Sequence, residues 1–307
     1  MSDKIAFRIS PMLATLVDKP FHLSGWIYEE KYDGVRILAY KEGPRISLVT
    51  RNGIVRTDRY PEVAAAVSKL KPQTLLLDGE VVVFDKRNVS HFQLLQQGKG
   101  PVKYAVFDCL YLNGKDSRSA PLRERRETLT QLLRAGGTGT IVLSEQLAAN
   151  GLKAFEVATK RKLEGLVAKN LESRYVEKRS REWLKAKVNR ESEFVIGGYT
   201  KPGGSRQYLG ALLLGVYEGN KLRYAGKVGT GFDTATLRTL SDELKKLRQD
   251  KSPFADQVRE KTVTFVHPKL VAQIAYTEWT KDGRLRHPAF LGLRDDKAPQ
   301  EVRKEEA

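Results

Sequence analysis

Residues 29–36 read EEKYDGVR, and this stretch decides how the rest of the chain is interpreted. Lys31 follows two carboxylates and precedes an Asp33-Gly34 pair. Taken alone, the stretch is typical of a solvated hairpin turn built on Asp-Gly. The chemical alternative is that the Lys31 amine attacks the α-phosphate of a nucleotide and forms a phosphoramidate.

The chemical alternative makes a demand on the rest of the chain. Attack requires the neutral amine, whereas a free lysine titrates near about 10.4. Neighbouring cations and a metal lower the pKa of an amine. The hypothesis therefore predicts that further Lys and Arg residues converge on Lys31, together with carboxylates that can hold a metal.

Segments of that composition follow in order along the chain. They are TRNG at 50–53, LDGE at 77–80, YAVFDCLYLNG at 104–114, EGLVAK at 164–169 and WLKAKVN at 183–189. SPML at 10–13, GGYTKPGGSRQYLGALLLGVY at 197–217 and RHPAFLGLRDDK at 286–297 belong to the same series. The series resembles the signature motifs of the covalent nucleotidyltransferase superfamily. Within it, the chain is most similar to ATP-dependent DNA ligases, in particular the ligase module of the bacterial end-joining ligase D family, over nearly its whole length.

Composition points to a polyanionic partner. The 307 residues carry 54 Lys and Arg against 37 Asp and Glu, a net charge of +17. Such an excess favours nucleic acid, because each cation placed on a phosphate releases condensed counterions. A basic protein without a nucleic-acid role is the alternative. Hydrophobic residues make up 40%, which is enough for a folded core without disulfides.

The kind of metal and the cellular compartment can be predicted from features that the sequence lacks. One cysteine excludes a disulfide within the chain, and one cysteine with four dispersed histidines argues against zinc. A metal would then sit on carboxylates and phosphates, which predicts Mg²⁺, with Mn²⁺ as a substitute. The N-terminus lacks the apolar core of a signal peptide, and no stretch approaches the roughly 20 apolar residues of a membrane span. We therefore expect a protein of the bacterial cytoplasm, associated with the nucleoid.

The pattern of strand-like and helix-like runs predicts an α+β fold in two domains. Up to about residue 188, strand-like and helix-like runs alternate, and after it short strands are broken by Gly and Pro turns. Expected strands are 37–40, 46–50, 75–77 with 81–84, 104–111 and 166–169, and then 193–199, 210–218, 221–228, 262–265 and 271–279. Expected helices are 62–70, 122–133, 153–161 and 233–248.

The resemblance names these domains. It implies a nucleotidyltransferase (adenylyltransferase) domain over residues 1–189, with ATP-grasp-like antiparallel sheets and helices. A small OB-fold β-barrel follows over residues 190–307, which agrees with five or so short strands and one helix. Residues 190–192, around Glu191, are the expected hinge.

By the same resemblance, Lys31 is the nucleophile that becomes adenylylated. Glu29 would accept a hydrogen bond from the exocyclic amine of adenine, and Glu30 is expected in the same nucleotide site. Arg36 and Arg51 would grip the ribose-phosphate of AMP and the DNA 5′-phosphate, since a guanidinium pairs bidentately with phosphate. The alternatives are an exposed carboxylate at Glu29 and an ordinary turn arginine at Arg51.

Three further residues have structural alternatives of their own. Glu80 would bind the ribose hydroxyl or a metal, although Asp78-Gly79 before it is typical of a tight hairpin. Phe107 would stack on adenine or simply pack in the core. Glu164 would be the second metal carboxylate, with Gly165 allowing close backbone approach, or would mark a helix end turning into a strand.

The remaining implied site residues are cations. Lys185 and Lys187 alternate on one strand face and would cradle the α-phosphate, unless they mark a solvated strand edge. Arg286, Arg294 and Lys297 would orient the pyrophosphate leaving group. The alternative for these three is a charged C-terminal tail.

The implied reaction has three steps. Lys31 attacks ATP and releases pyrophosphate, the DNA 5′-phosphate takes the AMP, and the 3′-hydroxyl displaces it to close a nick in duplex DNA. ATP and Mg²⁺ are the implied cofactors. The resemblance also suggests Ku and a polymerase or primase module as partners of a monomeric ligase without a membrane association.

Two other functions are compatible with part of the pattern. An RNA ligase or an mRNA-capping guanylyltransferase shares the lysine chemistry, although SPML, GALLLGVY and Glu29 favour the DNA enzyme. A basic nucleic-acid-binding module without catalysis is the alternative from another class.

Overall fold

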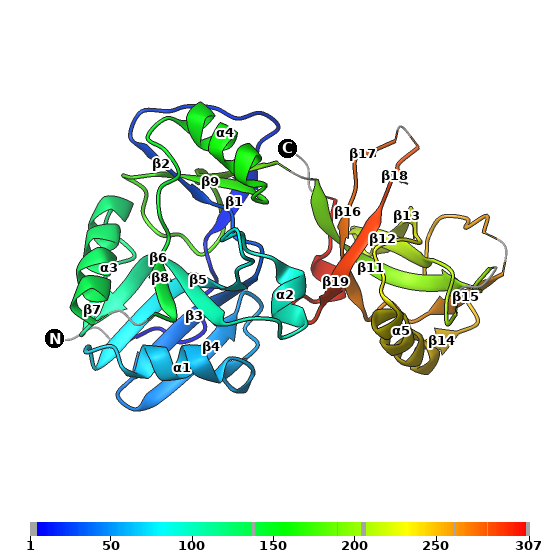
Figure 1. Ribbon diagram of the computed structural model, residues 1–307, viewed down its shortest axis with the longest axis horizontal. Helices are drawn as coiled ribbons and strands as arrows, with labels where there is room; N and C mark the ends of the chain where they lie inside the picture. The colour runs from blue at the N-terminus through cyan, green and yellow to red at the C-terminus, as the bar shows by residue number, and fades with distance from the viewer. Residues whose placement is uncertain are drawn as a thin grey trace. The chain divides into compact units, whose positions relative to one another are not determined.

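The computed structural model describes residues 5–136, 139–188, 190–203, 207–260, 262–280 and 282–304. The chain divides into two compact units, one formed by Met1–Val188 and the other by Asn189–Glu306 (Figure 1). Asn189, the last residue of the expected first domain, lies outside the described residues. Within those residues, no helix is long and apolar enough to cross a membrane.

The first unit contains a six-stranded sheet with one face covered by helices. Its strands run in the order β4 (Arg45–Thr50), β3 (Val35–Glu42), β5 (Thr74–Val83), β6 (Val102–Leu112), β7 (Lys115–Asp116), with β8 (Ile141–Leu143) also beside β6. Alternate residues such as Ile37 and Leu77 point to the face that α1 (Pro61–Ser68) and α3 (Leu122–Gly136) cover, and form one core there.

A four-stranded sheet forms the rest of this unit. Its order is β1 (Leu13–Leu16), β10 (Arg179–Lys187), β9 (Gly165–Asn170), β2 (Trp26–Glu30). Tyr28, Leu166 and Ala186 pack on one face with α4 (Gly151–Arg161). A Cβ on Gly165 would lie 2.2 Å from the Ala186 carbonyl oxygen, so glycine is required for β9 and β10 to approach this closely.

A third core cluster lies between the two sheets. Leu38, Leu76 and Phe107 come from the six-stranded sheet, and Trp183 comes from β10 of the four-stranded sheet. Each sheet is therefore apolar towards its own helices and partly apolar towards the other sheet. Polar side chains that lie between the sheets are therefore surrounded by this third core cluster.

Neither Asp-Gly pair forms the hairpin that it suggests. Asp33-Gly34 links β2 to β3, which belong to different sheets. Asp78-Gly79 lies inside β5, which runs unbroken where the sequence suggested two strands. Gly79 is instead required for packing, because a Cβ there would lie 2.6 Å from both the Ala105 oxygen and the Tyr104 ring.

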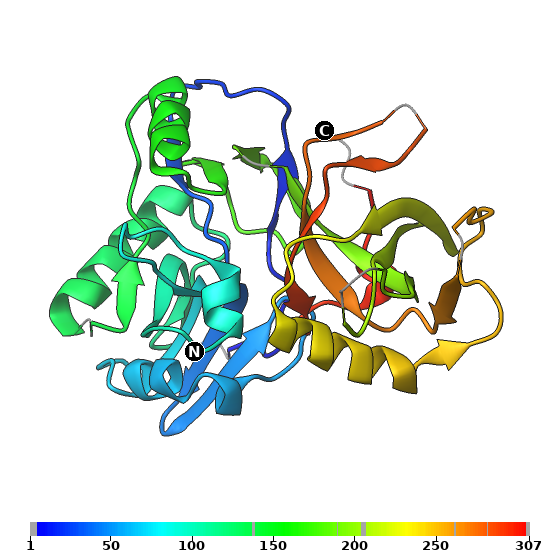
Figure 2. The ribbon, with the colours of Figure 1, turned by 45° about the vertical axis from the view of Figure 1, so that its right-hand side comes forward.

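The second unit is a curled sheet around one core. The strand order is β13 (Lys221–Val228), β12 (Leu212–Glu218), β11 (Glu191–Thr200), β15 (Val263–Val266), β14 (Arg248–Gln249), and β16 (Val271–Ala275) joins β11 to β19 (Ala289–Arg294). β11 pairs with β16 through its first half and with β15 through its second. The register of β11 with β12 shifts between Ile196 and Gly198, at the point where β11 changes from β16 to β15 as its other neighbour. Figure 2 shows α5 (Thr234–Lys246) along the side of these strands.

Three expectations for the second unit need correction. The predicted strand 271–279 is β16 followed by the short β17 (Glu278–Trp279), which pairs with β18 (Leu285–Arg286). Arg286 and Arg294 do not lie in a charged tail, because Arg286 belongs to β18, which pairs with β17, and Arg294 ends β19, which pairs with β16. The expected hinge residue Glu191 already pairs with Ala275 inside the second unit, so the chain passes between the units at 188–189.

The segment 104–114 contains a buried ion pair. Asp108 accepts bonds of 2.8 and 2.9 Å from Arg125 on α3, and both side chains are 0% exposed. Arg125 also donates to the Ala120 and Ser173 carbonyl oxygens. The pair connects β6, α3 and the segment after β9. The buried charge of Asp108 therefore has a structural role, and Asp108 need not belong to the candidate site.

Asp108→Asn is expected to lower the free energy of unfolding by about 3–5 kcal/mol, because Arg125 would be left buried without its counter-charge. Denaturant titration followed by tryptophan fluorescence measures the change. Asp242→Asn on α5, where the aspartate side chain is 57% exposed, is the matched control and should change stability by less than about 0.5 kcal/mol. Equal effects of the two substitutions would contradict the assignment.

Candidate active site

The four-stranded sheet brings four predicted site residues into register on one face. Glu29 on β2 and Lys185 on β10 both pair with Val167 of β9, one on each side. Two residues further on, Lys31 donates its backbone N–H to Gly165 O at 3.0 Å, and Lys187 pairs with Gly165. Since positions two apart along a strand share a face, Glu29, Lys31, Lys185 and Lys187 lie on the face opposite α4.

The Lys31 side chain bonds to a carboxylate. Its Nζ donates to Glu164 Oε1, and the side chains are 20% and 7% exposed. Burial alone would lower the pKa of Lys31, but attraction to Glu164, with Asp33 and Glu80, outweighs it and raises the pKa above the ordinary value. Carboxylates surround this amine, as predicted for a site that holds a metal, and the lowering of its pKa by cations and a metal stays a prediction.

Glu29 is held by two cations that the sequence did not single out. The carboxylate is 1% exposed, accepts from Arg126 of α3, and accepts a 2.7 Å bond from Lys169 Nζ of β9. It is not the exposed carboxylate of the alternative prediction. Lys169 stands in the quoted segment 164–169, whereas nothing in the helical run around Arg126 indicated its role.

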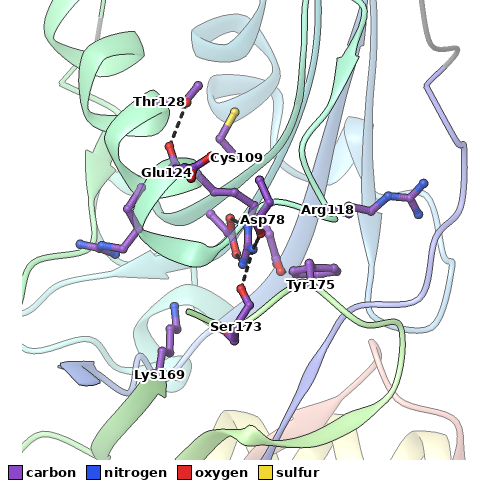
Figure 3. A network of polar contacts seen from close by, with 12 residues as sticks. Asp78, Cys109, Arg118, Glu124, Thr128, Lys169, Ser173 and Tyr175 are labelled. Atoms are coloured by element: carbon purple, nitrogen blue, oxygen red, sulfur yellow. Dashed lines mark hydrogen bonds and ion pairs between the residues drawn. The ribbon is translucent and has the colours of Figure 1, made fainter. Parts of the chain in front are cut away.

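Arg36 on β3, the predicted phosphate-binding arginine, is held in place by the Asp78 carboxylate. Arg36 donates Nε and Nη2 to the two Asp78 oxygens at 2.9 and 2.6 Å, and Tyr175 donates its hydroxyl to Asp78 at 2.7 Å. Figure 3 shows Tyr175 beside Asp78, with Lys169 rising from β9 towards them. Burial opposes the charge on Arg36, but Asp78 outweighs it and raises the pKa of the guanidinium.

Two aromatic rings line the space between the sheets. Phe107 and Trp183 meet edge to face with centroids 6.1 Å apart. Lys169 Nζ lies 4.1 Å from the first ring centroid and 4.3 Å from the second, and the Arg36 guanidinium lies 5.3 Å from Phe107. Phe107 does pack in the core, as one prediction held, and it also presents its ring to cations.

Glu80 lies on β5 of the six-stranded sheet, and Arg51 directly follows β4 of the same sheet. Glu80 is the cross-strand partner of Arg36 and contributes to the raised pKa of both Arg36 and Lys31. Arg51 begins the tight turn after β4, which closes with Gly53 N–H donating to Thr50 O at 2.9 Å. The predicted turn is therefore present at Arg51.

Glu30 points away from Glu29, because adjacent strand residues face opposite sides. Its carboxylate accepts a 3.3 Å bond from Ser90 Oγ and lies 3.5 Å from Arg161. Burial raises its pKa to about 7, against the lowering effects of Arg161 and Ser90. The structure thus separates Glu30 from the Glu29–Lys31 face where the sequence placed it.

The carboxylates present suit one kind of metal. Among the described residues, no three or more His, Cys, Asp and Glu side chains gather into a metal-binding group. Magnesium is usually held by one or two carboxylates together with phosphates and waters, not by an all-protein cage. Glu164 and Glu80, both acting electrostatically on Lys31, fit such a shared site.

Comparison with known proteins identifies the family. Residues 11–187 match the family model described as "ATP dependent DNA ligase domain", and residues 205–297 match "ATP dependent DNA ligase C terminal region". The chain belongs to the ATP-dependent DNA ligases.

Relatives of this ligase place it more closely. It is 40% identical over 305 residues to the multifunctional non-homologous end joining protein LigD of Pseudomonas aeruginosa, covering 96% of this chain but 36% of that protein. The mycobacterial DNA ligase D complexed with ATP and MES is 35% identical, with a TM-score of 0.72 over 96% of this chain and 97% of that one. The ligase domain of M. tuberculosis LigD is 35% identical, with a TM-score of 0.55 over 97% and 98%.

The likeness confirms the predicted fold class, a nucleotidyltransferase-type domain followed by an OB-type half-barrel.

The predicted site residues of the ligase's second unit each bond to a carboxylate within that unit. Arg294 pairs bidentately with Asp296 at 2.8 Å, Lys297 Nζ lies 2.6 Å from Glu193, and Arg286 donates to Glu278 at 2.5 Å.

In this ligase, the ionised Glu30 carboxylate is expected to lower the free energy of unfolding at high pH, and Glu30→Gln should remove that effect. The folded pKa of about 7 lies above the ordinary 4.5, so Glu30 contributes stability below pH 4.5 that is lost as pH rises through 7. Relative to wild type, the Gln variant should be near neutral at pH 5 and more stable by on the order of 3 kcal/mol at pH 8.

Denaturant unfolding at both pH values measures the difference. Glu243→Gln on α5 is the control, because that side chain is 45% exposed and should show no such pH dependence. A Glu30→Gln effect of the same size at pH 5 and pH 8 would disprove the raised pKa.

Proposed function

We propose that this chain is an ATP-dependent DNA ligase that carries AMP on Lys31 and seals nicks bearing a 5′-phosphate and a 3′-hydroxyl. The observation that carries the proposal is the shared face of Glu29, Lys31, Lys185 and Lys187 in a chain of this family. Residues 1–189 would act as the adenylyltransferase domain and residues 190–307 as the OB-fold domain.

In the first step, Lys31 Nζ forms a bond to the α-phosphorus of ATP, and pyrophosphate leaves. The amine must first give up to water the proton that it now shares in its hydrogen bond with Glu164 Oε1. In the second step, a DNA 5′-phosphate oxygen displaces Lys31 and takes the AMP. In the third step, the 3′-hydroxyl displaces AMP, and Lys31 no longer takes part.

The surrounding residues would bind the nucleotide. Glu29, oriented by Arg126 and Lys169, offers carboxylate oxygens to an amino group, which suits adenine. Phe107 offers a ring for stacking, and Glu80 offers oxygens to the ribose. These assignments rest on the family pattern together with the placement of each side chain between the two sheets.

Phosphate would be bound by the cations on either side. Lys185 and Lys187 would cradle the α-phosphate from β10, and Arg36 with Arg51 would hold AMP phosphate and the DNA 5′-phosphate. Asp78 restrains the Arg36 fork, so little orientational freedom is lost when an anion binds.

A divalent metal, Mg²⁺ or Mn²⁺, would be held by Glu80 and Glu164. When bound, such a cation neutralises phosphate charge and competes with Lys31 for Glu164, which would bring the pKa of the amine down. Arg286, Arg294 and Lys297 would orient the departing pyrophosphate, with a hinge where the first unit ends at Val188 moving the second unit between steps.

The cellular role is proposed from the relatives. The Pseudomonas relative is named for non-homologous end joining, and this chain spans about 36% of its length. We infer a role in DNA repair through end joining, on nicked duplex DNA. A monomeric state, partnership with Ku and a polymerase or primase module, and location at the nucleoid stay predictions.

Incubation with ATP and Mg²⁺ should raise the intact mass of the protein by one AMP, located at Lys31 by peptide mapping. Lys31→Ala should show no adduct, because the substitution removes the amine that bonds to Glu164. GTP should give no adduct, which distinguishes a guanylyltransferase, and chelation of the metal should abolish labelling.

The wild-type protein should then close a 5′-phosphorylated nick in duplex DNA, and nicked RNA should be closed far more slowly. Lys31→Ala should close neither. Absence of an AMP adduct on the wild-type protein with every nucleoside triphosphate would overturn the proposed function in favour of a binding module.

A further inference from the structure

One buried hydroxyl bridges the residues on both sides of Lys31. Ser90 Oγ donates to Glu30 Oε1 at 3.3 Å and accepts from the Asp33 backbone N–H at 3.0 Å. Ser90 is 4% exposed. A single side chain thus fixes the residue before Lys31 and the residue two positions after it.

The loop between β2 and β3 is fixed by other contacts as well. The Asp33 carboxylate accepts from the Phe92 N–H at 3.0 Å, at the start of α2 (Phe92–Gln96). A Cβ on Gly34 would lie 2.2 Å from Val81 O, so the loop lies directly against β5. On its other side, Lys31 N–H bonds to Gly165 O.

Ser90 is itself placed by the strand that carries Glu80. After β5 the chain turns back, with Asp85 N–H donating to Val89 O at 2.8 Å and the Asp85 carboxylate accepting from the Val89 N–H. Phe84 and Ser90 then form a β-bridge. The turn therefore links β5 to the Lys31 loop through Ser90.

We propose that Ser90 is a positioning residue for Lys31, acting from the side of β2 that faces away from the nucleotide. The proposal rests on the proposed function, in which Lys31 Nζ attacks phosphorus. Attack requires the amine near 3–3.5 Å from the α-phosphorus and in line with the leaving group, and a displacement of about 1 Å can cost 10²-fold in rate. Lys31 has a long side chain, so fixing its backbone on both sides narrows the positions that Nζ visits.

The three steps of ligation separate positioning from general structure. Lys31 takes part in forming and in transferring the AMP, but not in the third step on a nick that already carries AMP. A residue that only positions Lys31 should affect the first two steps and spare the third. A residue that only stabilises the fold should affect all three together.

The experiment compares the wild-type protein, Ser90→Ala and Ser173→Ala. Ser173 is also 4% exposed, and its hydroxyl donates to Asn170 O at 2.7 Å, away from Lys31, so it is a matched control. Single-turnover formation of lysyl-AMP at saturating ATP should be about 10–100-fold slower in Ser90→Ala. The ATP concentration for half-maximal rate, and sealing of a pre-adenylylated nick, should stay within about 2-fold. Ser173→Ala should match the wild type in each.

Equal rates of lysyl-AMP formation in Ser90→Ala and wild type would overturn the proposal, and so would equal slowing of all three steps. Should Ser90→Ala fail to fold, Ser90→Cys, which keeps the side-chain size with a weaker hydrogen-bonding group, is measured in the same way with the same expected pattern. Failure of both to fold also overturns it, since Ser90 would then be structural. A wild-type protein that gains no AMP instead overturns the proposed function.

Discussion

The bond between the Lys31 ammonium and the Glu164 carboxylate is the interaction on which the site depends. It joins the end of β2 to the residue before β9, so it reports that two distant segments meet correctly. It also favours the charged form of the amine, because the nearby carboxylates raise the pKa of Lys31 by more than burial lowers it. A charged amine is not a nucleophile, so the proposed attack by Lys31 would require this pair to loosen. In that proposal, a group that binds Glu164 would raise the reactivity of Lys31.

Charge compensation organises the rest of the first unit. The carboxylates buried between the sheets each have cationic partners: Glu29 has Lys169 and Arg126, and Asp78 has Arg36. An unpaired charge there would be costly, whereas a paired one is rigid and oriented. These paired ions are fixed in place, so they would need little rearrangement to bind the proposed phosphate. Ser90 fixes the backbone in a similar way, because its neutral hydroxyl links the Glu30 carboxylate to the Asp33 N–H.

Local patterns misled where an Asp-Gly pair suggested a hairpin. The residues 33–34 link two sheets, and 78–79 lie inside β5, because packing against Val81 and Tyr104 requires glycine at Gly34 and Gly79 for space and not for turning. The charged run at 286–294 was equally ambiguous, and pairing with β16 decided that it is strand. Hydrophobic period located most helices and strands, but period alone cannot tell which strands share a sheet.

By itself, the sequence determined the family and the α+β class and nominated the residues of the site, because the order of the motifs can be recognised without knowing which residues contact one another. Alternation also predicted that Lys185 and Lys187 share a face. Only the tertiary structure decided which charges meet. The partners of Glu29 lie 97 and 140 residues away in the chain, and the pKa of Lys31 depends on such neighbours. Electrostatic interactions act through space, so a residue's chemistry is set by the fold that surrounds it and not by its place in the sequence.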